Sequence, residues 1–428
     1  MNQELQPIAY MNGNLVLPSS KSISNRMLLL ASLVPYPVVI HNVLYAEDTL
    51  YLFNALKQLG VEIEKRHSTV IIKNSISLSN DVDKVITLNL HNAGTGLRPL
   101  CAILSFLGQG CFILTGNQRM QQRPILHLVD ALVTLGASIE YLGDIGYPPI
   151  KIRSTTMHQF EVTIDGSLSS QYVSALLMLS PIISRSLTIK IKNKLVSRPY
   201  IDMTLSILKL FKMNIIHDSY QSFYVEYSES KSLLEKLEYT VEGDASSASY
   251  FFAASAIRSR QVKVYGLNRY SIQGDIGFLS VLEKMGASVA YYNDHIIVKQ
   301  STLTGIDIDM NDMPDVAMTL AVLAVFAKGK TVIRNIYNWK IKESDRLVAM
   351  YNELRKVGAV VSIGDDFIMI EPPKKFLPAV INTYNDHRMA MCFSLMAFSG
   401  QVITITGSEC VNKTYPSFFN DWRALSSF

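Results

Sequence analysis

The sequence predicts a mixed α/β (α+β) fold of two pseudo-symmetric domains, each built from three repeats. Two patterns predict this: a polar helix start that leads into an apolar run, and an amphipathic helix that ends at glycine before a strand. The first pattern occurs six times, and successive copies are 73, 74, 77, 69 and 72 residues apart. The residues used as markers for this spacing are Ser22, Thr95, Ser169, Ser246, Asp315 and His387.

Each copy of the first pattern predicts a buried helix, because a helix that is apolar all round belongs in a core. The serine, threonine, asparagine and aspartate residues at the starts are ordinary N-caps. The copies lie at 20–33, 92–106, 165–179, 243–257, 313–326 and 385–398.

The second pattern predicts an amphipathic helix and a half-buried strand on either side of a left-handed cap, which glycine tolerates. A weaker copy at 208–216 has lost its glycine. The clear copies are 56–64, 132–141, 282–291 and 354–363. The polar segment 228–240 is a candidate crossover between the two halves.

Composition excludes several classes of function. A net charge of +4 over 428 residues is too small to indicate nucleic acid binding by itself. The four cysteines have no metal-binding spacing, so we expect free thiols in a reducing cytoplasm and no metal. Residues 1–10 lack the features of a signal peptide, and the apolar run 316–327 is too short for a membrane span. The expected location is cytoplasmic, without membrane association.

Cations accompany the polar helix starts. A helix start exposes unpaired N–H groups and about half a positive charge, so parallel buried helices would gather their starts into an anion-binding face. Several added cations indicate a ligand with more than one anionic group. They are Lys21, Arg26, Arg98, Arg123, Lys342, Arg346, Arg388 and Lys413.

Two carboxylates accompany these cations. Asp315 opens the predicted buried helix at 313–326, and Glu343 lies three residues before Arg346. This spacing fits a helical ion pair. A proton donor or acceptor held among cations is the alternative, which the spacing alone favours less.

Several strings together resemble the 5-enolpyruvylshikimate-3-phosphate synthase family, in particular its bacterial, glyphosate-sensitive members. They run in order from about residue 5 to about residue 420. The strings are LPSSKSISNR (17–26), NAGTGLRPL (92–100), RPILHLVDAL (123–132), DGSLSSQY (165–172), SRPYIDMTL (197–205), VEGDASSASYF (241–251), NIYNWKIKESDR (335–346) and TYNDHRMAM (383–391).

The resemblance implies βαβαββ repeats around buried parallel helices, three in each domain. One domain would comprise 22–239 and the other 1–21 with 240–428, with the active site in the cleft between them. The implied reaction transfers the enolpyruvyl group of phosphoenolpyruvate to the 5-hydroxyl of shikimate 3-phosphate, in the pathway to aromatic amino acids. It would run by addition and elimination through a tetrahedral intermediate. The resemblance implies no cofactor, and it implies a monomer.

The resemblance also assigns roles to residues. Lys21, Asp315 and Glu343 would be catalytic. The positions matching those that hold shikimate 3-phosphate are Lys21, Ser22, Arg26, Ser169, Ser170, Gln171, Ser197, Tyr200, Asp315, Asn338 and Lys342. The positions matching those around phosphoenolpyruvate are Lys21, Gly94, Arg123, Gln171, Arg346, Arg388 and Lys413.

Two positions depart from the family pattern: Ser19 stands where glycine is common, and Gly96 where alanine is common. Gly96 should loosen the backbone beside Gly94 and Thr95. Gly94 keeps the position without a side chain that admits glyphosate, so we expect this inhibitor to bind.

Two rival functions share the predicted fold. One is enolpyruvyl transfer to UDP-N-acetylglucosamine, against which DGSLSSQY (165–172) and NDHR (385–388) count. The other is a non-catalytic anion-binding scaffold. The presence of Lys21, Asp315 and Glu343 counts against that scaffold.

Overall fold

The computed structural model describes residues 1–78, 84–228 and 235–428, and they form two compact units. Unit 1 contains Met1–Ser19 and Glu242–Phe428, and unit 2 contains Ser20–Val241. The chain therefore passes between the units twice. Of the candidate crossover at 228–240, residues 229–234 lie outside the described residues, and Leu237–Thr240 forms strand β14 of unit 2.

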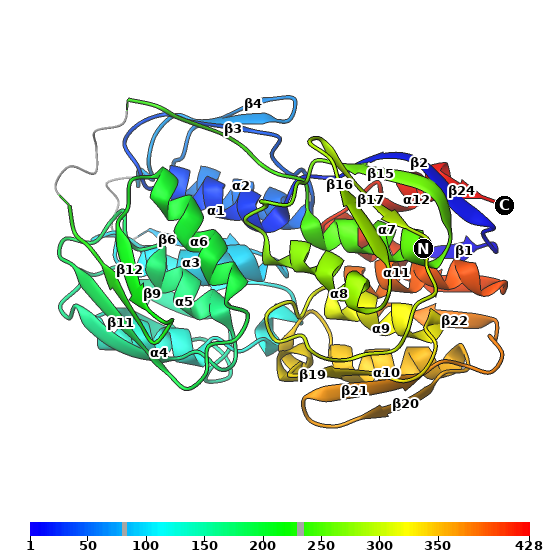
Figure 1. Cartoon of the computed structure of the whole chain (residues 1–428). Coiled ribbons are helices and arrows are strands. Elements are labelled where there is room, and N and C mark those ends of the chain that lie inside the picture. The colour runs from blue at the N-terminus through cyan, green and yellow to red at the C-terminus, as the bar shows by residue number, and fades with distance from the viewer. Residues whose placement is uncertain (79–83, 229–234) are drawn as a thin grey trace. The chain divides into compact units, whose positions relative to one another are not determined.

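Unit 2 contains three repeats, each with a buried helix followed by an amphipathic one (Figure 1). The first consists of α1 (Lys21–Ala31), β3 (Val38–His41), α2 (Glu47–Gln58), β4 (Ile63–Arg66) and β5 (Thr69–Ile72). The second consists of β6 (Val85–Asn89), α3 (Gly94–Ser105), β7 (Cys111–Thr115), η1 (Met120–Gln122), α4 (Leu126–Thr134), β8 (Ser138–Tyr141) and β9 (Ile150–Arg153). The third consists of β10 (Glu161–Asp165), α5 (Ser170–Leu177), β11 (Leu187–Lys192), α6 (Pro199–Leu210), β12 (Ile215–Asp218) and β13 (Ser222–Val225).

Each repeat of unit 2 has its own four-stranded sheet, which combines one parallel pair with two antiparallel pairs. In the second repeat β6 runs parallel to β7, while β9 is antiparallel to both β7 and β8. The first repeat lacks a strand before α1. Strand β14, from the far end of the unit, fills this place and pairs with β3 in parallel, with Leu237 opposite Val38.

Unit 1 repeats the plan. Its first repeat consists of β2 (Tyr10–Val16), α7 (Ala245–Ile257), β15 (Ser259–Tyr265), η2 (Gly274–Gly277), α8 (Phe278–Lys284), β16 (Ser288–Tyr291) and β17 (His295–Lys299). The second consists of β18 (Asp307–Asp309), α9 (Ala317–Leu323), η3 (Ala324–Phe326), β19 (Thr331–Arg334), η4 (Tyr337–Ile341), α10 (Arg346–Lys356), β20 (Val360–Ile363) and β21 (Phe367–Glu371). The third consists of β22 (Ala379–Asn382), α11 (His387–Phe393), η5 (Ser394–Ser399), β23 (Ile403–Thr406), η6 (Ser408–Lys413), α12 (Phe418–Leu425) and β24 (Ser426–Ser427).

The third repeat of unit 1 departs from the plan at its end. Strand β24 joins the sheet of β2, and β1 (Asn2–Leu5) pairs antiparallel with β23 instead. The amphipathic helix α12 is therefore followed by a strand that leaves for another sheet. Its C-cap is Ser426 in an extended conformation, so the helix-glycine-strand pattern of the other repeats is missing here.

The predicted fold class is confirmed, and the buried helices α1, α3, α5, α7, α9 and α11 follow the six polar starts. Two contacts show that α9 and α11 run in the same direction. Asp315 contacts Arg388, and one turn further along both segments Thr319 contacts Cys392. One detail differs from the expectation, since Asp315 lies in the turn before α9 and not within the helix.

The glycine caps take the predicted left-handed conformation. Gly60, Gly136, Gly286 and Gly358 have φ between 78° and 109°. In the weaker copy Lys212 stands at the equivalent place with φ 59°, so the cap survives the loss of glycine. A side chain in this region costs free energy that glycine avoids.

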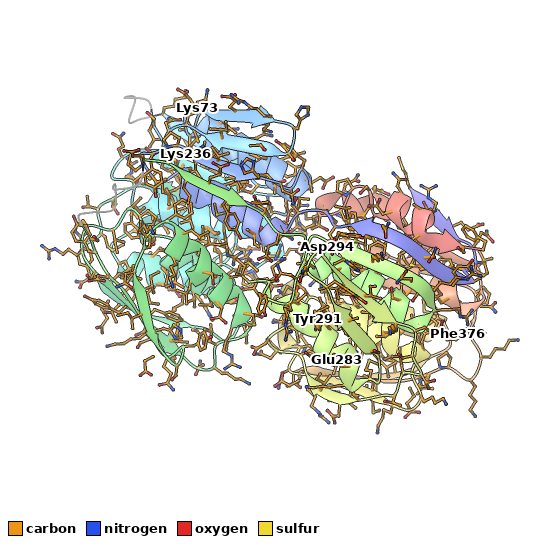
Figure 2. The ribbon with its side chains drawn as sticks, turned by 45° about the horizontal axis from the view of Figure 1, so that its top comes forward. Lys73, Lys236, Glu283, Tyr291, Asp294 and Phe376 are labelled. Atoms are coloured by element: carbon orange, nitrogen blue, oxygen red, sulfur yellow. The ribbon has the colours of Figure 1, made fainter. Side chains whose placement is uncertain are left out.

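Among the described residues, every helix is too short or too polar to traverse a lipid bilayer. Lys73 and Lys236, beside the sheet β14–β3–β5–β4, lie on the surface and pair with Glu64 and Glu238 (Figure 2). Exposed pairs of this kind contribute little to stability.

Gly96 offers a test of the departure from the family pattern. A methyl group there would meet Leu90 and Leu52 side-chain carbons at 3.4 Å and 3.7 Å, which is ordinary contact. We expect Gly96→Ala to raise the free energy of unfolding by about 0.5–1 kcal/mol, because alanine loses less backbone entropy in a helix. Urea denaturation measures this change. Gly116→Ala is the matched control and should destabilise, since its methyl would lie 2.2 Å from the His91 carbonyl oxygen.

Candidate functional site

The start of α1 supplies the first buried cation of unit 2. Ser20 caps the helix by accepting a hydrogen bond from the backbone N–H of Ile23. Lys21, the first helical residue, is 8% exposed, and its Nζ lies 3.3 Å from Asp48 Oδ2 at the start of α2. The Lys21 ammonium is therefore anchored beside the helix start by a buried carboxylate.

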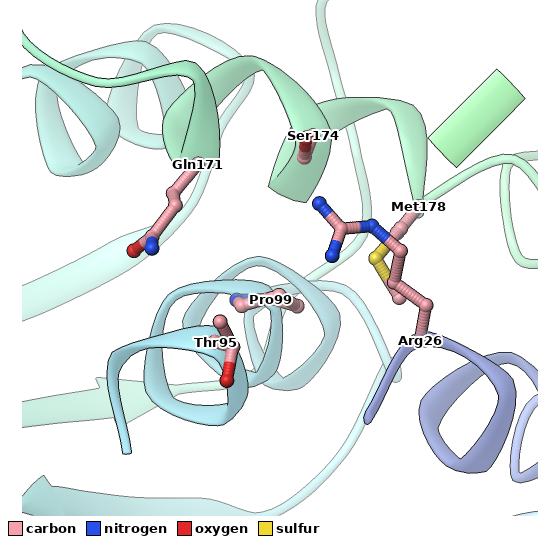
Figure 3. Close-up of a pocket in the computed structure, with 6 residues that line it drawn as sticks. All are labelled: Arg26, Thr95, Pro99, Gln171, Ser174 and Met178. Atoms are coloured by element: carbon pink, nitrogen blue, oxygen red, sulfur yellow. The ribbon is translucent and has the colours of Figure 1, made fainter. Parts of the chain in front are cut away.

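Arg26 lies one turn further along α1 and is also buried. Its Nε donates to Thr204 Oγ1 at 2.8 Å, and its two terminal nitrogens donate to the carbonyl oxygens of Ser22 and Tyr200. Burial lowers the pKa of Arg26 to about 10, which leaves it charged at neutral pH. In Figure 3 its guanidinium points into a pocket that Gln171 and other residues of α3 and α5 also line.

The start of α3 places two guanidinium groups against a glycine. A methyl group on Gly94 would lie 2.5 Å from Arg98 Nη1 and 3.1 Å from both terminal nitrogens of Arg123. Arg98 donates to the Pro124 carbonyl oxygen, and Arg123 donates to Asn92 Oδ1 at 3.0 Å. Gly94 thus leaves room for two buried arginines at one helix start.

The start of α5 carries the predicted serine pair and Gln171. Ser169 is the N-cap and accepts from the backbone N–H of Gln171, while Ser170 is buried. The buried Oε1 of Gln171 has no hydrogen-bond partner among the described residues, so it is an available acceptor. Ser197, before α6, has φ 54°, a strained conformation that clusters at functional sites. Its carbonyl oxygen accepts from Tyr200.

Asp315 is the centre of the cluster in unit 1. Its Oδ1 accepts from Arg346 Nη1 at 2.9 Å, and its Oδ2 accepts from Arg388 Nη2 at 2.9 Å. Lys342 Nζ lies 3.6 Å from Oδ1. Burial alone would raise the pKa of Asp315, but these three cations hold it well below the usual value. Asp315 is therefore ionised at neutral pH.

Arg346 joins three carboxylates and is 1% exposed. Besides Asp315 it donates from Nη2 to Glu343 Oε2 at 2.9 Å and from Nε to Asp386 Oδ2 at 2.8 Å. Burial would lower the pKa of Arg346, yet the three carboxylates raise it above the usual value for arginine. The Glu343–Arg346 ion pair forms, but it is not a pair within a helix, because Glu343 lies in the bend before α10, which begins at Arg346. The geometry is compatible with a proton donor or acceptor held among cations.

The remaining predicted residues of unit 1 lie in the short helices η4 and η6. Trp339 Nε1 donates to the Pro314 carbonyl oxygen at 2.7 Å, which ties η4 to the turn that carries Asp315. Asn338, in η4, is buried, and its Oδ1 has no hydrogen-bond partner among the described residues. Lys413, at the end of η6, is 6% exposed.

The predicted residues thus fall into two sets, one in each unit, which are called the unit 1 and unit 2 clusters below. Several of their partners were not predicted from the sequence. The unit 2 cluster contains Lys21, Ser22, Arg26, Gly94, Arg123, Ser169, Ser170, Gln171, Ser197 and Tyr200. The unit 1 cluster contains Asp315, Asn338, Lys342, Glu343, Arg346, Arg388 and Lys413. The partners missed are Asp48, Thr204, Tyr250 and Asp386.

A signal for one missed partner was present. Asp386 immediately precedes α11 and caps it, accepting from the backbone N–H of Arg388. An aspartate at that position predicts a cap.

In the part of the chain that the structure describes, no three His, Cys, Asp or Glu side chains gather in a way that could hold a metal ion.

The fold that these repeats form is shared with a solved enolpyruvyl transferase. A solved structure of the enolpyruvyl transferase NikO from Streptomyces tendae superposes with a TM-score of 0.78 at 16% identity, covering 99% of this chain and 96% of that one. A structure of EPSP synthase from Acinetobacter baumannii superposes with a TM-score of 0.81 at 23% identity, covering 99% and 98%. These likenesses establish the fold.

The chain belongs to the EPSP synthase (3-phosphoshikimate 1-carboxyvinyltransferase) family, whose model matches residues 5–422. A relative from Shewanella halifaxensis, named 3-phosphoshikimate 1-carboxyvinyltransferase, is 50% identical and covers 100% of both chains. A relative of the same name from Vibrio cholerae is 48% identical over 99% of both chains.

Proposed function

We infer that this chain transfers the enolpyruvyl group of phosphoenolpyruvate to the 5-hydroxyl of shikimate 3-phosphate and releases phosphate. Family membership gives the reaction. The observation that carries the mechanism is the pair of carboxylates, Asp315 and Glu343, on one buried arginine. Paired carboxylates can divide acid and base work between them.

We propose the following division of roles. Asp315, with Lys21, removes the proton of the 5-hydroxyl, since its carboxylate is ionised. Glu343 protonates the methylene carbon of phosphoenolpyruvate while the hydroxyl oxygen attacks the central carbon. The tetrahedral intermediate then loses phosphate while the Glu343 carboxylate takes back a proton from the methyl group, which restores the double bond. Arginine and lysine side chains neutralise the carboxylate of phosphoenolpyruvate and the departing phosphate.

Each substrate has ligands from both clusters in this proposal. Arg26, Ser170 and Gln171 are among the groups that hold shikimate 3-phosphate, which Asn338 and Lys342 also contact. Lys21, Arg123, Arg346, Arg388 and Lys413 hold phosphoenolpyruvate. The buried acceptors on Gln171 and Asn338 support this assignment, because a ligand hydroxyl would satisfy them. Domain closure on the substrates, a monomeric state and a cytoplasmic location remain part of the proposal.

Phosphate release tests the function. The protein is incubated with phosphoenolpyruvate and either shikimate 3-phosphate or UDP-N-acetylglucosamine. Release with shikimate 3-phosphate alone is expected. Release only with the nucleotide sugar would overturn the acceptor assignment, and release with neither, from a folded protein, would favour a non-catalytic scaffold.

Gly94 should decide sensitivity to glyphosate. A methyl group there would push the Arg98 and Arg123 guanidinium groups, which lie within 3.1 Å of its position. We expect Gly94→Ala to raise the glyphosate concentration for half-inhibition by at least about tenfold, equivalent to ~1.4 kcal/mol. Inhibition curves at fixed phosphoenolpyruvate measure this, with Gly96→Ala as the control. An unchanged curve for Gly94→Ala would count against placing the inhibitor here.

A further inference from the structure

Asp275 is a buried carboxyl group beside the unit 1 cluster that the mechanism above does not use. It lies in η2 and is 5% exposed. Its Oδ2 accepts a hydrogen bond from Ser246 Oγ, in the first turn of α7. The donor is a neutral hydroxyl, whereas Asp315 accepts from two guanidinium groups. The hydrogen bond from Ser246 therefore stabilises the charge on Asp275 less than a hydrogen bond from a guanidinium group would.

Helix α7 links Asp275 to the residues that hold the ligand. One turn after Ser246, the hydroxyl of Tyr250 accepts from Arg388 Nη1 at 3.1 Å. Arg388 also donates to Asp315. The charged groups that act on Asp275 are Asp315 and Asp244, which oppose its ionisation, and Arg388, which favours it.

Effects that oppose and effects that favour ionisation of Asp275 act together. Burial first, and then repulsion by Asp315, raise the pKa of Asp275 to about 6, although Arg388 and Ser246 lower it. An anion bound at Arg388 would add a further negative charge in a desolvated site. That charge would favour the neutral form of Asp275.

We propose that Asp275 takes up a proton from solvent when phosphoenolpyruvate binds at Arg388, and thereby makes binding of this substrate stronger at lower pH. The inference rests on the proposed function for its ligand. Asp275 does not touch the substrate in this proposal, so it is a positioning residue that acts through the charge on Arg388.

The direction in which affinity for phosphoenolpyruvate changes with pH follows from the linkage between binding and protonation. Binding raises the pKa of Asp275 from about 6, so affinity is highest when the group is already protonated and falls as pH rises through and above that value. Asparagine at this position is permanently neutral and keeps the hydrogen-bond acceptor for Ser246. The ratio of the KM for phosphoenolpyruvate in Asp275→Asn to that in the wild type cancels titration of the substrate itself.

We expect this ratio to be near one at pH 5.5 and to fall by about threefold to tenfold at pH 8, where one pKa unit corresponds to about tenfold in affinity. Asp309→Asn, an acid-to-amide change on β18, should leave the ratio constant. A merely structural role for Asp275 would instead raise KM or lower kcat at every pH. A ratio that does not change with pH would overturn the proposal.

Ser246→Ala provides a second test that does not depend on whether Asp275→Asn folds. It removes the hydrogen bond to the ionised carboxylate, so the pH at which KM begins to rise should move upward. If the wild type shows no turnover, the proposed function fails. Calorimetric binding of phosphoenolpyruvate in two buffers of different ionisation enthalpy then measures proton uptake directly. Binding without proton uptake, or no binding, would overturn the role of Asp275.

Discussion

Glu343→Gln is expected to lower kcat by at least about a hundredfold, equivalent to ~3 kcal/mol in the barrier. Glutamine keeps the size of the side chain and an oxygen that accepts from Arg346 Nη2, as Glu343 does at 2.9 Å. It cannot donate a proton to the methylene carbon and take it back. The KM values for both substrates should change little, because the arginine and lysine side chains remain.

Steady-state phosphate release gives kcat and KM for this variant. The matched control is Glu353→Gln near the other end of α10, which also removes a buried carboxylate paired with a cation three residues later. It should reduce stability and leave kcat within a few-fold of the wild type. Turnover near the wild-type rate in Glu343→Gln would remove Glu343 from the proton transfer and leave it a structural partner of Arg346.

The repeats were predictable because the residues that determine each helix and its caps lie close together in the sequence. An N-cap, an apolar run and a capping glycine are all signals carried by neighbouring residues. The left-handed cap forms even where Lys212 replaces the glycine. Exchange of strands between repeats is not local. Nothing near α1 indicates that Leu237–Thr240 supplies its missing strand, and the glycine pattern fails at α12 because β24 joins another sheet.

The candidate site divides in the same way. Cations at helix starts can be found from the sequence, since the repeat marks where each start lies. Their partners depend on contacts across the repeats, such as Lys21 with Asp48 or Arg26 with Thr204. Asp275 is the clearest case, because its pKa depends on burial and on groups from three other segments.

Arg346→Gln is expected to lower the free energy of unfolding at pH 7 by about 3–5 kcal/mol, because it leaves buried carboxylates without their shared cation. Asp386 and Glu343 would lose a direct hydrogen-bond donor, and Asp315 would keep only Arg388 and Lys342. Urea denaturation at pH 7 measures the loss. Lys342→Gln is the control, since its side chain is 21% exposed and 3.6 Å from Asp315, and it should cost less than about 1 kcal/mol.

The pH dependence separates this electrostatic effect from a packing defect. In the wild type the pKa of Asp315 is held well below its usual value, so its stabilising contribution is present at neutral pH and is lost as pH falls below about 4. In Arg346→Gln the pKa of Asp315 is higher, so this carboxyl group takes up its proton at a higher pH than in the wild type. The difference in stability between the two proteins should therefore narrow between pH 7 and pH 4. If the difference in the free energy of unfolding between the two proteins is constant with pH, Arg346 stabilises the fold through packing alone. Its contacts with Asp315 and Glu343 would then make no electrostatic contribution to stability.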